Sequence, residues 1–310
     1  MIIANPLYDI IFKRLMENKR IARYFVETLI EEHVEEIAMM PQEYTYYAKV
    51  SNKEKRTEAE IDENTEHWEV LSLIRFDFVA TIRNSNGEYK KVLIEIQKSS
   101  NPTDLMRFRT YLGEQYKRMD VVEIATGKVE KALPIISIYL LGFTLPEIDA
   151  VAVKVGRTYI DMIEKKKIEQ KSSWIESLTH DGYFVQIPKV KGNPRTSLEK
   201  LLSIFEQKYF INEKNTIKEY DYIVDDDNVK NIVEVLRHAA SDAKTKREME
   251  EAWWADLKAE GLERELQEVK KEIEESNRML SESNRMLEEN KKTLEDKDKE
   301  IAELKRLLGK

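Results

Sequence analysis

The feature that most constrains the fold is a pair of apolar segments, joined by a short turn, in which side-chain character alternates. Residues 73–82 and residues 91–98 each place an apolar side chain at every second position. A period of two predicts β-strands. The turn between them contains Gly87, which supplies the positive φ that a tight hairpin turn needs. The two segments therefore predict a β-hairpin.

The register of this hairpin sets two carboxylates against each other. A three-residue loop pairs Asn84 with Glu88, and counting back along the strands pairs Asp77 with Glu95. Residues directly opposite on adjacent strands have Cβ atoms roughly 5 Å apart, and carboxylates at that distance repel and desolvate each other. A divalent cation between them removes the repulsion, and hard ions such as Mg²⁺ prefer carboxylate oxygens and water. We therefore predict a metal site at Asp77 and Glu95.

Gln97 lies two residues beyond Glu95 and faces the same side of the strand. Its carboxamide can orient a water molecule that attacks a phosphate, while the metal ion neutralises charge on that phosphate. The alternative is structural, with Asp77 in water on a solvated sheet face and Glu95 paired with Arg75. The symmetry of the two carboxylates about the turn, together with Gln97, favours the metal site.

The composition limits the class of protein. At 310 residues the chain can form one sizeable core plus an extension. It contains no cysteine, which excludes disulfides, thiolate zinc sites and cysteine nucleophiles and fits a reducing cytoplasm. No segment approaches the roughly 20 apolar residues of a membrane span, and the first residues carry no signal-peptide pattern. We expect a soluble, cytoplasmic protein with no membrane partner.

The net charge of −8 is unlike that of a general nucleic-acid binder. A metal-dependent nuclease can still be acidic overall, because a local basic patch and the bound ions attract the DNA backbone. Charge alone therefore does not exclude a DNA substrate.

The remaining patterns predict an α/β fold. In order along the chain, we expect a helix at 8–33, a strand at 35–47 and a charged loop or long hairpin tip at 48–69. The two strands described above follow at 73–82 and 91–98, then a helix at 104–119 and a strand buried on both faces at 132–141. This order predicts a mixed sheet with helices packed on it.

The helix at 104–119 begins after Thr103, a residue type that caps helix N-termini. Its apolar stripe is predicted to contain four residues: Leu105, Phe108, Leu112 and Met119. We expect a core domain at 1–150 and, at 151–260, an α-rich extension that completes the core or packs on it.

The last 50 residues differ from the rest of the chain. Apolar residues recur every seven positions without a break: Leu266, Ile273, Leu280, Leu287, Leu294, Ile301 and Leu308. A seven-residue repeat predicts a coiled coil over 261–310, and Asn277 and Asn284 fall at a positions, where polar residues limit register and oligomeric state. We predict a parallel homodimer, with a single solvated helix as the alternative.

This combination of elements and residues resembles the PD-(D/E)XK phosphodiesterase superfamily. Within it, the chain looks like the nuclease-family "transposase" proteins, close to the recombination-promoting nucleases of bacteria. Three stretches carry the likeness over roughly residues 5–145: Asp9-Ile10-Ile11-Phe12-Lys13, the pair Asp77…Glu95-x-Gln97, and Arg107-Phe108-Arg109-Thr110-Tyr111 through Gln115-Tyr116 with the later Leu141-Gly142-Phe143.

The resemblance implies a restriction-endonuclease-like core that cleaves DNA with Mg²⁺ or Mn²⁺. The metal ligands would be Asp77, Glu95 and the main-chain carbonyl of Ile96. Asp9 matches an acidic residue of the first helix that joins the catalytic site. Gln97 stands where most of the superfamily has a catalytic lysine, which removes a cation from the site.

Helical residues are the candidates to replace that cation and to hold DNA. Lys98 points away from the site because side chains alternate along a strand. Lys13 or Arg109 would supply the missing charge, and Arg107, Arg109 or Lys117 would hold backbone phosphates. Phosphate contacts do not read sequence, so we expect little base specificity from this core.

The sequence thus favours a metal-dependent DNA endonuclease, with other functions open. One alternative is a catalytically weak or inactive nuclease scaffold that acts as a coiled-coil assembly or DNA-bridging protein. Other enzyme classes have little support, because the nine glycines are scattered singly and no HExxH motif occurs among the four histidines.

Overall fold

The computed structural model describes residues 1–40, 43–49, 68–75, 77–97, 102–124, 126–307 and 309, with the backbone alone at 43–49, 68–75, 102–104, 259–260, 263 and 267. The chain divides into two compact units, Met1–Glu250 and Glu251–Lys310. In the described part of the chain, no helix combines the length and the apolar character that a membrane crossing requires.

A mixed six-stranded sheet forms the centre of the first unit, which confirms the predicted α/β class. Its strands lie in the order β10 (Ala152–Val155), β13 (His180–Gln186), β9 (Ile135–Leu141), β6 (Tyr89–Gln97), β5 (Phe78–Asn84) and β2 (Val34–Met39). β9 runs parallel to both of its neighbours, and the other pairs are antiparallel. The predicted strand at 132–141 is therefore a central strand, and nearly all of its side chains are buried.

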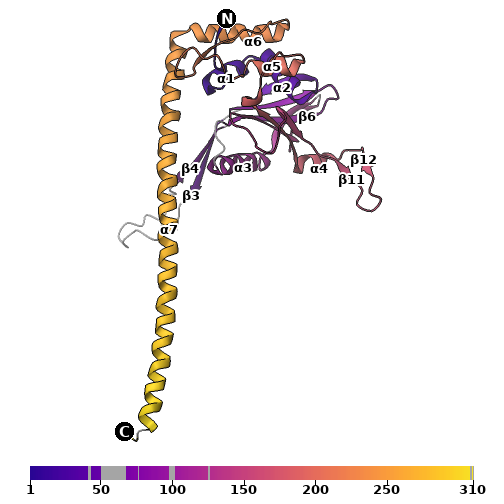
Figure 1. Cartoon of the computed structure of the whole chain (residues 1–310). Helices are drawn as coiled ribbons and strands as arrows, with labels where there is room; N and C mark the ends of the chain where they lie inside the picture. Colours follow the sequence, from indigo (N-terminus) through magenta and orange to yellow (C-terminus); the bar gives the residue numbers. More distant parts are fainter. Residues whose placement is uncertain are drawn as a thin grey trace, which may run out of the picture. The chain divides into compact units, whose positions relative to one another are not determined.

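Helices cover both faces of this sheet (Figure 1). α3 (Pro102–Tyr116) lies on one face, while the other face is covered by α1 (Asp9–Glu17), α2 (Lys19–Ile30) and α5 (Ser197–Ser203). On the α3 side, a core of Val79, Leu93 and Ile135 packs against residues of α3 that include Tyr111 and Leu112.

An aromatic cluster joins the helices of the opposite layer. Phe12 of α1, Phe25 of α2 and Phe205 just after α5 are almost fully buried. Their ring centroids lie 5.7, 5.8 and 6.5 Å apart in edge or tilted contacts, a favourable arrangement for aromatic rings. This packing fixes α1, the helix that carries Asp9 and Lys13.

The helix predicted at 8–33 is two helices, α1 and α2, separated at Asn18. The Asn18 side chain accepts hydrogen bonds from the backbone N–H groups of Arg20 (3.1 Å) and Ile21 (3.3 Å). Asn18 is thus the N-cap of α2, since its oxygen satisfies N–H groups that have no partner within the helix. The apolar period continues across the break, so periodicity alone did not reveal it.

The predicted strand at 73–82 is also divided. Its first part belongs to β4 (Trp68–Arg75), which pairs with β3 (Glu43–Lys49) in a separate two-stranded sheet, whereas β5 begins at Phe78. The predicted strand at 35–47 is likewise shared between β2 and β3. Of the charged segment 48–69, residues 50–67 lie outside the described residues.

The α3 prediction is correct in place and partly wrong in its buried face. The helix begins at Pro102, so Thr103 lies inside it rather than before it. The helix ends at Tyr116, so Met119 lies beyond it rather than on its apolar stripe. Leu105 is 59% exposed, whereas Leu112 contacts the core. Helical spacing predicts which residues share a face, but not how far along the helix the sheet extends.

The segment 151–260 contains strands as well as helices. β10 and β13 complete the main sheet, and β14 (Ile217–Glu219) pairs with β1 (Ile2–Ala4). Its other elements are β11 (Tyr159–Ile160), β12 (Lys167–Ile168), α4 (Ser173–Leu178), the 3₁₀ turn Ile187–Lys189, α5 and α6 (Asp227–Ser241). A further hairpin, β7 (Asp120–Ile124) with β8 (Gly127–Lys131), was not predicted.

The second unit consists of one helix, α7, which spans Ala243–Leu307 and begins within the first unit. The predicted heptad residues from Leu266 to Ile301 lie on it and are 48–63% exposed. Leu308 lies outside the described residues. A long C-terminal helix is therefore confirmed.

Candidate functional site

The hairpin of β5 and β6 has the register that the sequence predicts. The Asn84 N–H donates to the Glu88 carbonyl at 3.0 Å, and Gly87 has a φ of 76°. The ladder then pairs residues up to Phe78 with Ile94. Asp77 directly precedes β5, so the next position in this register sets it opposite Glu95.

Asp77 and Glu95 are both buried, with exposed fractions of 7% and 6%. Each carboxylate interacts with the backbone of the other strand. Asp77 Oδ2 accepts a hydrogen bond of 2.6 Å from the Ile96 N–H, and the Glu95 carboxylate accepts one from the Asp77 backbone. The predicted alternative of a solvated Asp77 is therefore wrong, because the side chain is held inside the protein.

Asp9 joins these two carboxylates from the first turn of α1. Its side chain is hydrogen-bonded to that of Asp77, and it is half exposed. Lys13, one turn later, has its Nζ 3.9 Å from Asp9 Oδ2. The structure thus brings together residues that lie about 70 positions apart in the sequence.

The electrostatic environment favours the protonated form of both buried carboxyls. Burial raises the pKa of Asp77 well above its usual range, and the negative charge of Asp9 raises it further, while Lys13 lowers it. Burial also raises the pKa of Glu95, followed by the charge of Asp77, and Arg107 opposes the rise. The positive charges of Lys13 and Arg107 therefore do not offset the effect of burial on the pKa of these two carboxyls.

The two oxygens of Glu95 differ in their partners. Its Oε2 atom is buried and makes no hydrogen bond with any residue that the structure describes, whereas its Oε1 lies 3.9 Å from Arg107 Nη2 of α3. In the structural alternative to a metal site, Glu95 would pair with Arg75, whose side chain lies outside the described residues. A buried carboxylate oxygen without a partner is unfavourable, and a bound cation would satisfy it.

Arg107 connects Glu95 to Gln97. Its Nη2 donates to Gln97 Oε1 at 3.5 Å, and Gln97 is almost fully buried. The guanidinium carbon lies 5.7 Å from the ring centre of Phe108 and 6.0 Å from that of Tyr111, distances at which cation–π attraction operates. The aromatic rings and the polar groups therefore hold the Arg107 side chain at the end of β6.

Two other predicted cations differ in position. Arg109 is exposed on α3. Lys117 follows the end of α3, ten residues after Arg107, and its Nζ pairs with Glu114 at 2.6 Å. A helix rises about 1.5 Å per residue, so Lys117 lies roughly 15 Å from Arg107 along the helix axis.

Tyr139 is a residue of the site that the sequence analysis missed. It lies opposite Glu95 in the parallel pair of β6 and β9, and its ring contacts Phe108 edge-on (5.4 Å) and stacks on Phe184 (4.9 Å). Burial raises the pKa of its hydroxyl, and Glu95 adds to the rise. In the sequence, the signal for this residue was a tyrosine within a mostly apolar strand.

The donor set fits a hard divalent cation. It comprises the carboxylates of Asp77 and Glu95, the main-chain carbonyl of Ile96 and, nearer to solvent, the carboxylate of Asp9, all oxygen donors of the kind that Mg²⁺ prefers. Among the residues described, no three His, Cys, Asp or Glu side chains are already arranged to hold a metal. The fit therefore rests on the two buried carboxylates and the unpaired oxygen of Glu95.

Comparisons with known proteins assign neither a family nor a function. No protein-family model, no curated protein and no solved structure matches the chain. Function is therefore inferred from the residues and geometry of the site itself.

Proposed function

We propose that this chain is a metal-dependent DNA endonuclease of the PD-(D/E)XK type, related to the recombination-promoting nucleases. The observation that carries the proposal is the buried pair Asp77, directly before β5, and Glu95 on β6, in which Glu95 Oε2 has no hydrogen-bond partner among the described residues. A fold retains such a pair at a cost in stability, and sites of this kind concentrate where chemistry occurs.

Mg²⁺ or Mn²⁺ would be held by Asp77, Glu95 and the carbonyl of Ile96, with Asp9 beside them. When bound, such an ion supplies charge neutralisation at a phosphate and lowers the pKa of a water molecule. Two hydrogen bonds, one from the Ile96 N–H to the Asp77 carboxylate and one from the Asp77 backbone to the Glu95 carboxylate, keep both carboxylates in place before the ion binds. This preorganisation reduces the free energy needed to assemble the site.

The chain's own polar groups would act on the water and the phosphate. The Gln97 carboxamide can accept a hydrogen bond from the attacking water and so orient it. Arg107 is 45% exposed, whereas the Glu95 side chain beside it is 8% exposed, so its guanidinium lies where a phosphate can approach from solvent. We assign Arg107, rather than Arg109, the positive charge that lysine supplies in most of the superfamily.

Lys13 provides a second positive charge on the other side of the site, from α1. Contacts from Lys13 and Arg107 would be made to the DNA backbone, which is identical at every base pair. We therefore propose cleavage with little sequence preference.

Cleavage of supercoiled plasmid DNA in Mg²⁺ or Mn²⁺, with EDTA as the blank, tests the proposal. Asp77→Asn and Glu95→Gln keep the size of each side chain and remove its charge, and each should lower the rate by more than about 100-fold, beyond the usual loss for a supporting residue. Glu88→Gln, an exposed carboxylate at the far end of the same hairpin, is the matched control. Undiminished cleavage by both site variants would refute the assignment.

A second candidate function is an inactive nuclease scaffold that assembles through α7 and bridges DNA. Two observations favour it: Gln97 in place of the lysine, and the row of exposed apolar residues on α7. The two functions differ in metal binding, since a scaffold needs no ion. Wild-type protein that neither binds Mn²⁺ nor cleaves DNA would support the scaffold.

We also propose that α7 forms a parallel homodimeric coiled coil over residues 261–310. Six apolar residues at seven-residue spacing are each about half exposed or more: Leu266, Ile273, Leu280, Leu287, Leu294 and Ile301. A helix of 65 residues with such a row gains stability by burying it against an identical helix.

A further inference from the structure

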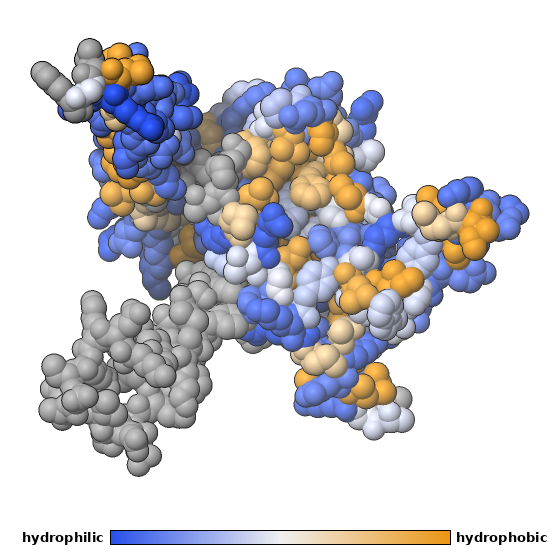
Figure 2. Space-filling view, turned by 90° about the horizontal axis from the view of Figure 1, so that it is seen from below, coloured by the Kyte–Doolittle hydropathy of each residue, from blue (hydrophilic) through white to orange (hydrophobic). Residues whose placement is uncertain are grey.

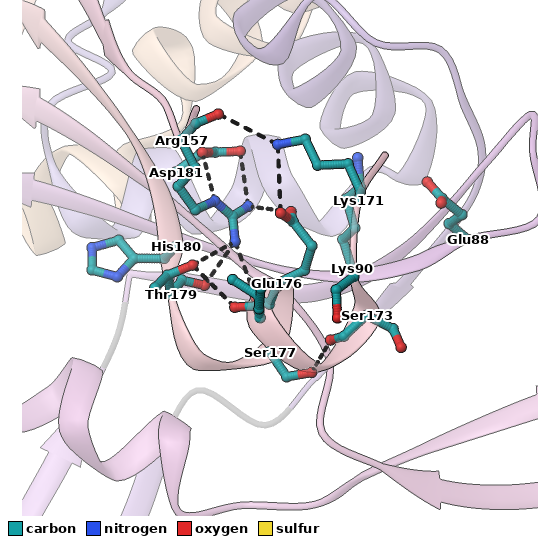
Figure 3. A network of polar contacts seen from close by, with 12 residues as sticks. Glu88, Lys90, Arg157, Lys171, Ser173, Glu176, Ser177, Thr179, His180 and Asp181 are labelled. Carbon is teal, nitrogen blue, oxygen red and sulfur yellow. Dashed lines mark hydrogen bonds and ion pairs between the residues drawn. The ribbon is translucent and has the colours of Figure 1, made fainter. Parts of the chain in front are cut away.

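Residues 157–178 form an arm that leaves the main sheet beyond β10 (Figure 1). The arm consists of the β11–β12 hairpin followed by α4. Its root is fixed by Arg157, whose guanidinium binds Asp181 through two hydrogen bonds of 3.0 Å (Figure 3). The same group pairs with Glu176 at 2.9 Å and donates to the Thr179 carbonyl at 3.1 Å. Arg157 thereby ties the hairpin to α4 and to β13.

The tip of the hairpin is an ordered turn. Asp161 Oδ1 accepts hydrogen bonds from the backbone N–H groups of Ile163 (2.8 Å) and Glu164 (3.0 Å), a local arrangement typical of Asx turns. This turn places Met162 and Ile163 at the outer end, where they are 75% and 88% exposed. Turn tips are normally polar, so two adjacent apolar side chains here call for an explanation.

Apolar exposure continues along the whole arm. The hydrophobic residues at its tip are visible in the lobe furthest to the right in Figure 2, which is the β11–β12 hairpin. α4 has no buried residue. Seven large apolar residues of the arm are exposed: Ile160, Met162, Ile163, Ile168, Trp174, Ile175 and Leu178.

The size of this surface matches that of a protein interface. If a large apolar side chain presents roughly 150–200 Å² when fully exposed, near the range for aromatic side chains, the arm offers on the order of 700 Å². A typical stable interface buries about 800 Å² from each partner.

The charges of the arm favour a second copy of this chain over DNA. Residues 157–178 contain five basic and four acidic side chains. The acids lie beside the bases: Lys167 pairs with Glu169 at 3.0 Å and Lys166 with Glu164 at 3.8 Å. A DNA-binding surface needs an excess of positive charge, whereas a nearly neutral, mixed surface can face its own copy without repulsion.

We propose that this arm is a self-association surface, in which the arms of two copies pack against each other across a two-fold axis. In such a contact the same patch serves both subunits, so it must be self-complementary, as the balanced charges allow. Trp174, Met162 and Ile163 would form its apolar centre, since aromatic residues and methionine are enriched there. The proposal does not depend on the nuclease activity or on the coiled coil.

The test uses the full chain with the heptad row of α7 disrupted by Leu280→Asp and Leu287→Asp, so that any remaining association reports on the arm. Sedimentation equilibrium should then give a mass of about twice the 36.6 kDa of one chain. Adding Met162→Glu and Ile163→Glu should reduce it to a single chain. The matched control is Ile211→Glu with Ile223→Glu, which alters apolar residues that are 51% and 91% exposed outside the arm and should leave the dimer intact.

Either of two results would overturn the proposal: a monomer at all concentrations before the arm is altered, or a dimer that persists after it is altered. Far-UV circular dichroism and thermal unfolding would establish that each variant is folded. The same arm variants would be tested for binding to duplex DNA and to anionic vesicles. Loss of either binding with no change of mass would show that the arm contacts that partner, and would also overturn the proposal.

Discussion

Asp77 Oδ2 accepts a hydrogen bond of 2.6 Å from the backbone N–H of Ile96, across two neighbouring strands. The bond draws the carboxylate of one strand against the backbone that carries Glu95. It therefore fixes two acidic groups in a buried position, where burial raises the pKa of both. The charge of Asp9 adds to the rise at Asp77, and the charge of Asp77 adds to the rise at Glu95.

Neutralising either buried carboxyl should stabilise the metal-free protein at alkaline pH. The fold raises the pKa of Asp77 and Glu95 above their values in the unfolded chain. The free energy of unfolding is therefore at its full value below about pH 4 and falls as the pH rises through the raised values. Asp77→Asn and Glu95→Gln should each raise it at pH 8 by at least about 1.4 kcal/mol, the equivalent of one pKa unit.

Urea titrations in EDTA at pH 4 and pH 8 measure this difference. At pH 4 the variants and the wild type should agree closely, because the wild-type carboxyls are then protonated. Glu88→Gln, outside the site, should change neither value. Site variants that are less stable than the wild type at pH 8 would show that the two carboxylates stabilise the fold without a metal.

Arg107→Gln should lower plasmid cleavage by about 100-fold, the usual loss when one donor to a transition-state charge is removed. The reason is its position beside Glu95 Oε1 (3.9 Å) and Gln97 Oε1 (3.5 Å). Arg109→Gln, which removes the same charge two residues further along the same helix, is the matched control and should lower cleavage only a few-fold. Equal losses in both variants would mean that α3 contributes only general attraction for DNA.

A peptide of residues 251–310, the second compact unit, should form a dimer whose helix melts at a temperature that rises with concentration. Leu280→Asp with Leu287→Asp should abolish this dependence, because charges replace the predicted seam. Met279→Asp with Met286→Asp alters residues of equal exposure one position away and should leave it unchanged. A wild-type peptide that stays monomeric would instead indicate a single solvated helix.

Asn18→Ala should destabilise the protein by about 1 kcal/mol, the typical effect of losing an N-cap. The two hydrogen bonds from Arg20 and Ile21 to the Asn18 side chain are its physical basis. Asn18→Asp, which keeps an acceptor oxygen, should leave the free energy of unfolding nearly unchanged. Urea unfolding of the three proteins makes the comparison, and equal losses in both variants would rule out a capping role.

The parts of the fold that the sequence predicted correctly depend on local rules. The turn at Gly87 and the alternation on either side sufficed to set Glu95 opposite Asp77, because register follows from loop length. The buried strand β9 followed from its continuous apolar character. The long helix α7 followed from its heptads.

The parts that were missed depend on distant contacts. The sequence indicates strands near 151–155 and 183–187, but nothing local shows that β13 pairs with β9 and extends the sheet, since that pairing joins residues about 45 positions apart. The break at Asn18 required its side chain to compete with the helix backbone, which periodicity does not reveal. For the site, the carboxylates and Gln97 were predictable, whereas the choice of Arg107 over Arg109 required the geometry of α3 against β6.

The most direct test is a calorimetric titration of the wild type, the two single variants and the double variant with Mn²⁺ at pH 8. If Asp77 and Glu95 hold one ion jointly, the wild type binds it. Asp77→Asn and Glu95→Gln should each weaken binding by more than about tenfold, and the double variant should lose less than the sum of the two effects, because neighbouring ligands are not independent. Absence of binding by the wild type, or unchanged affinity in both single variants, would contradict a shared metal site.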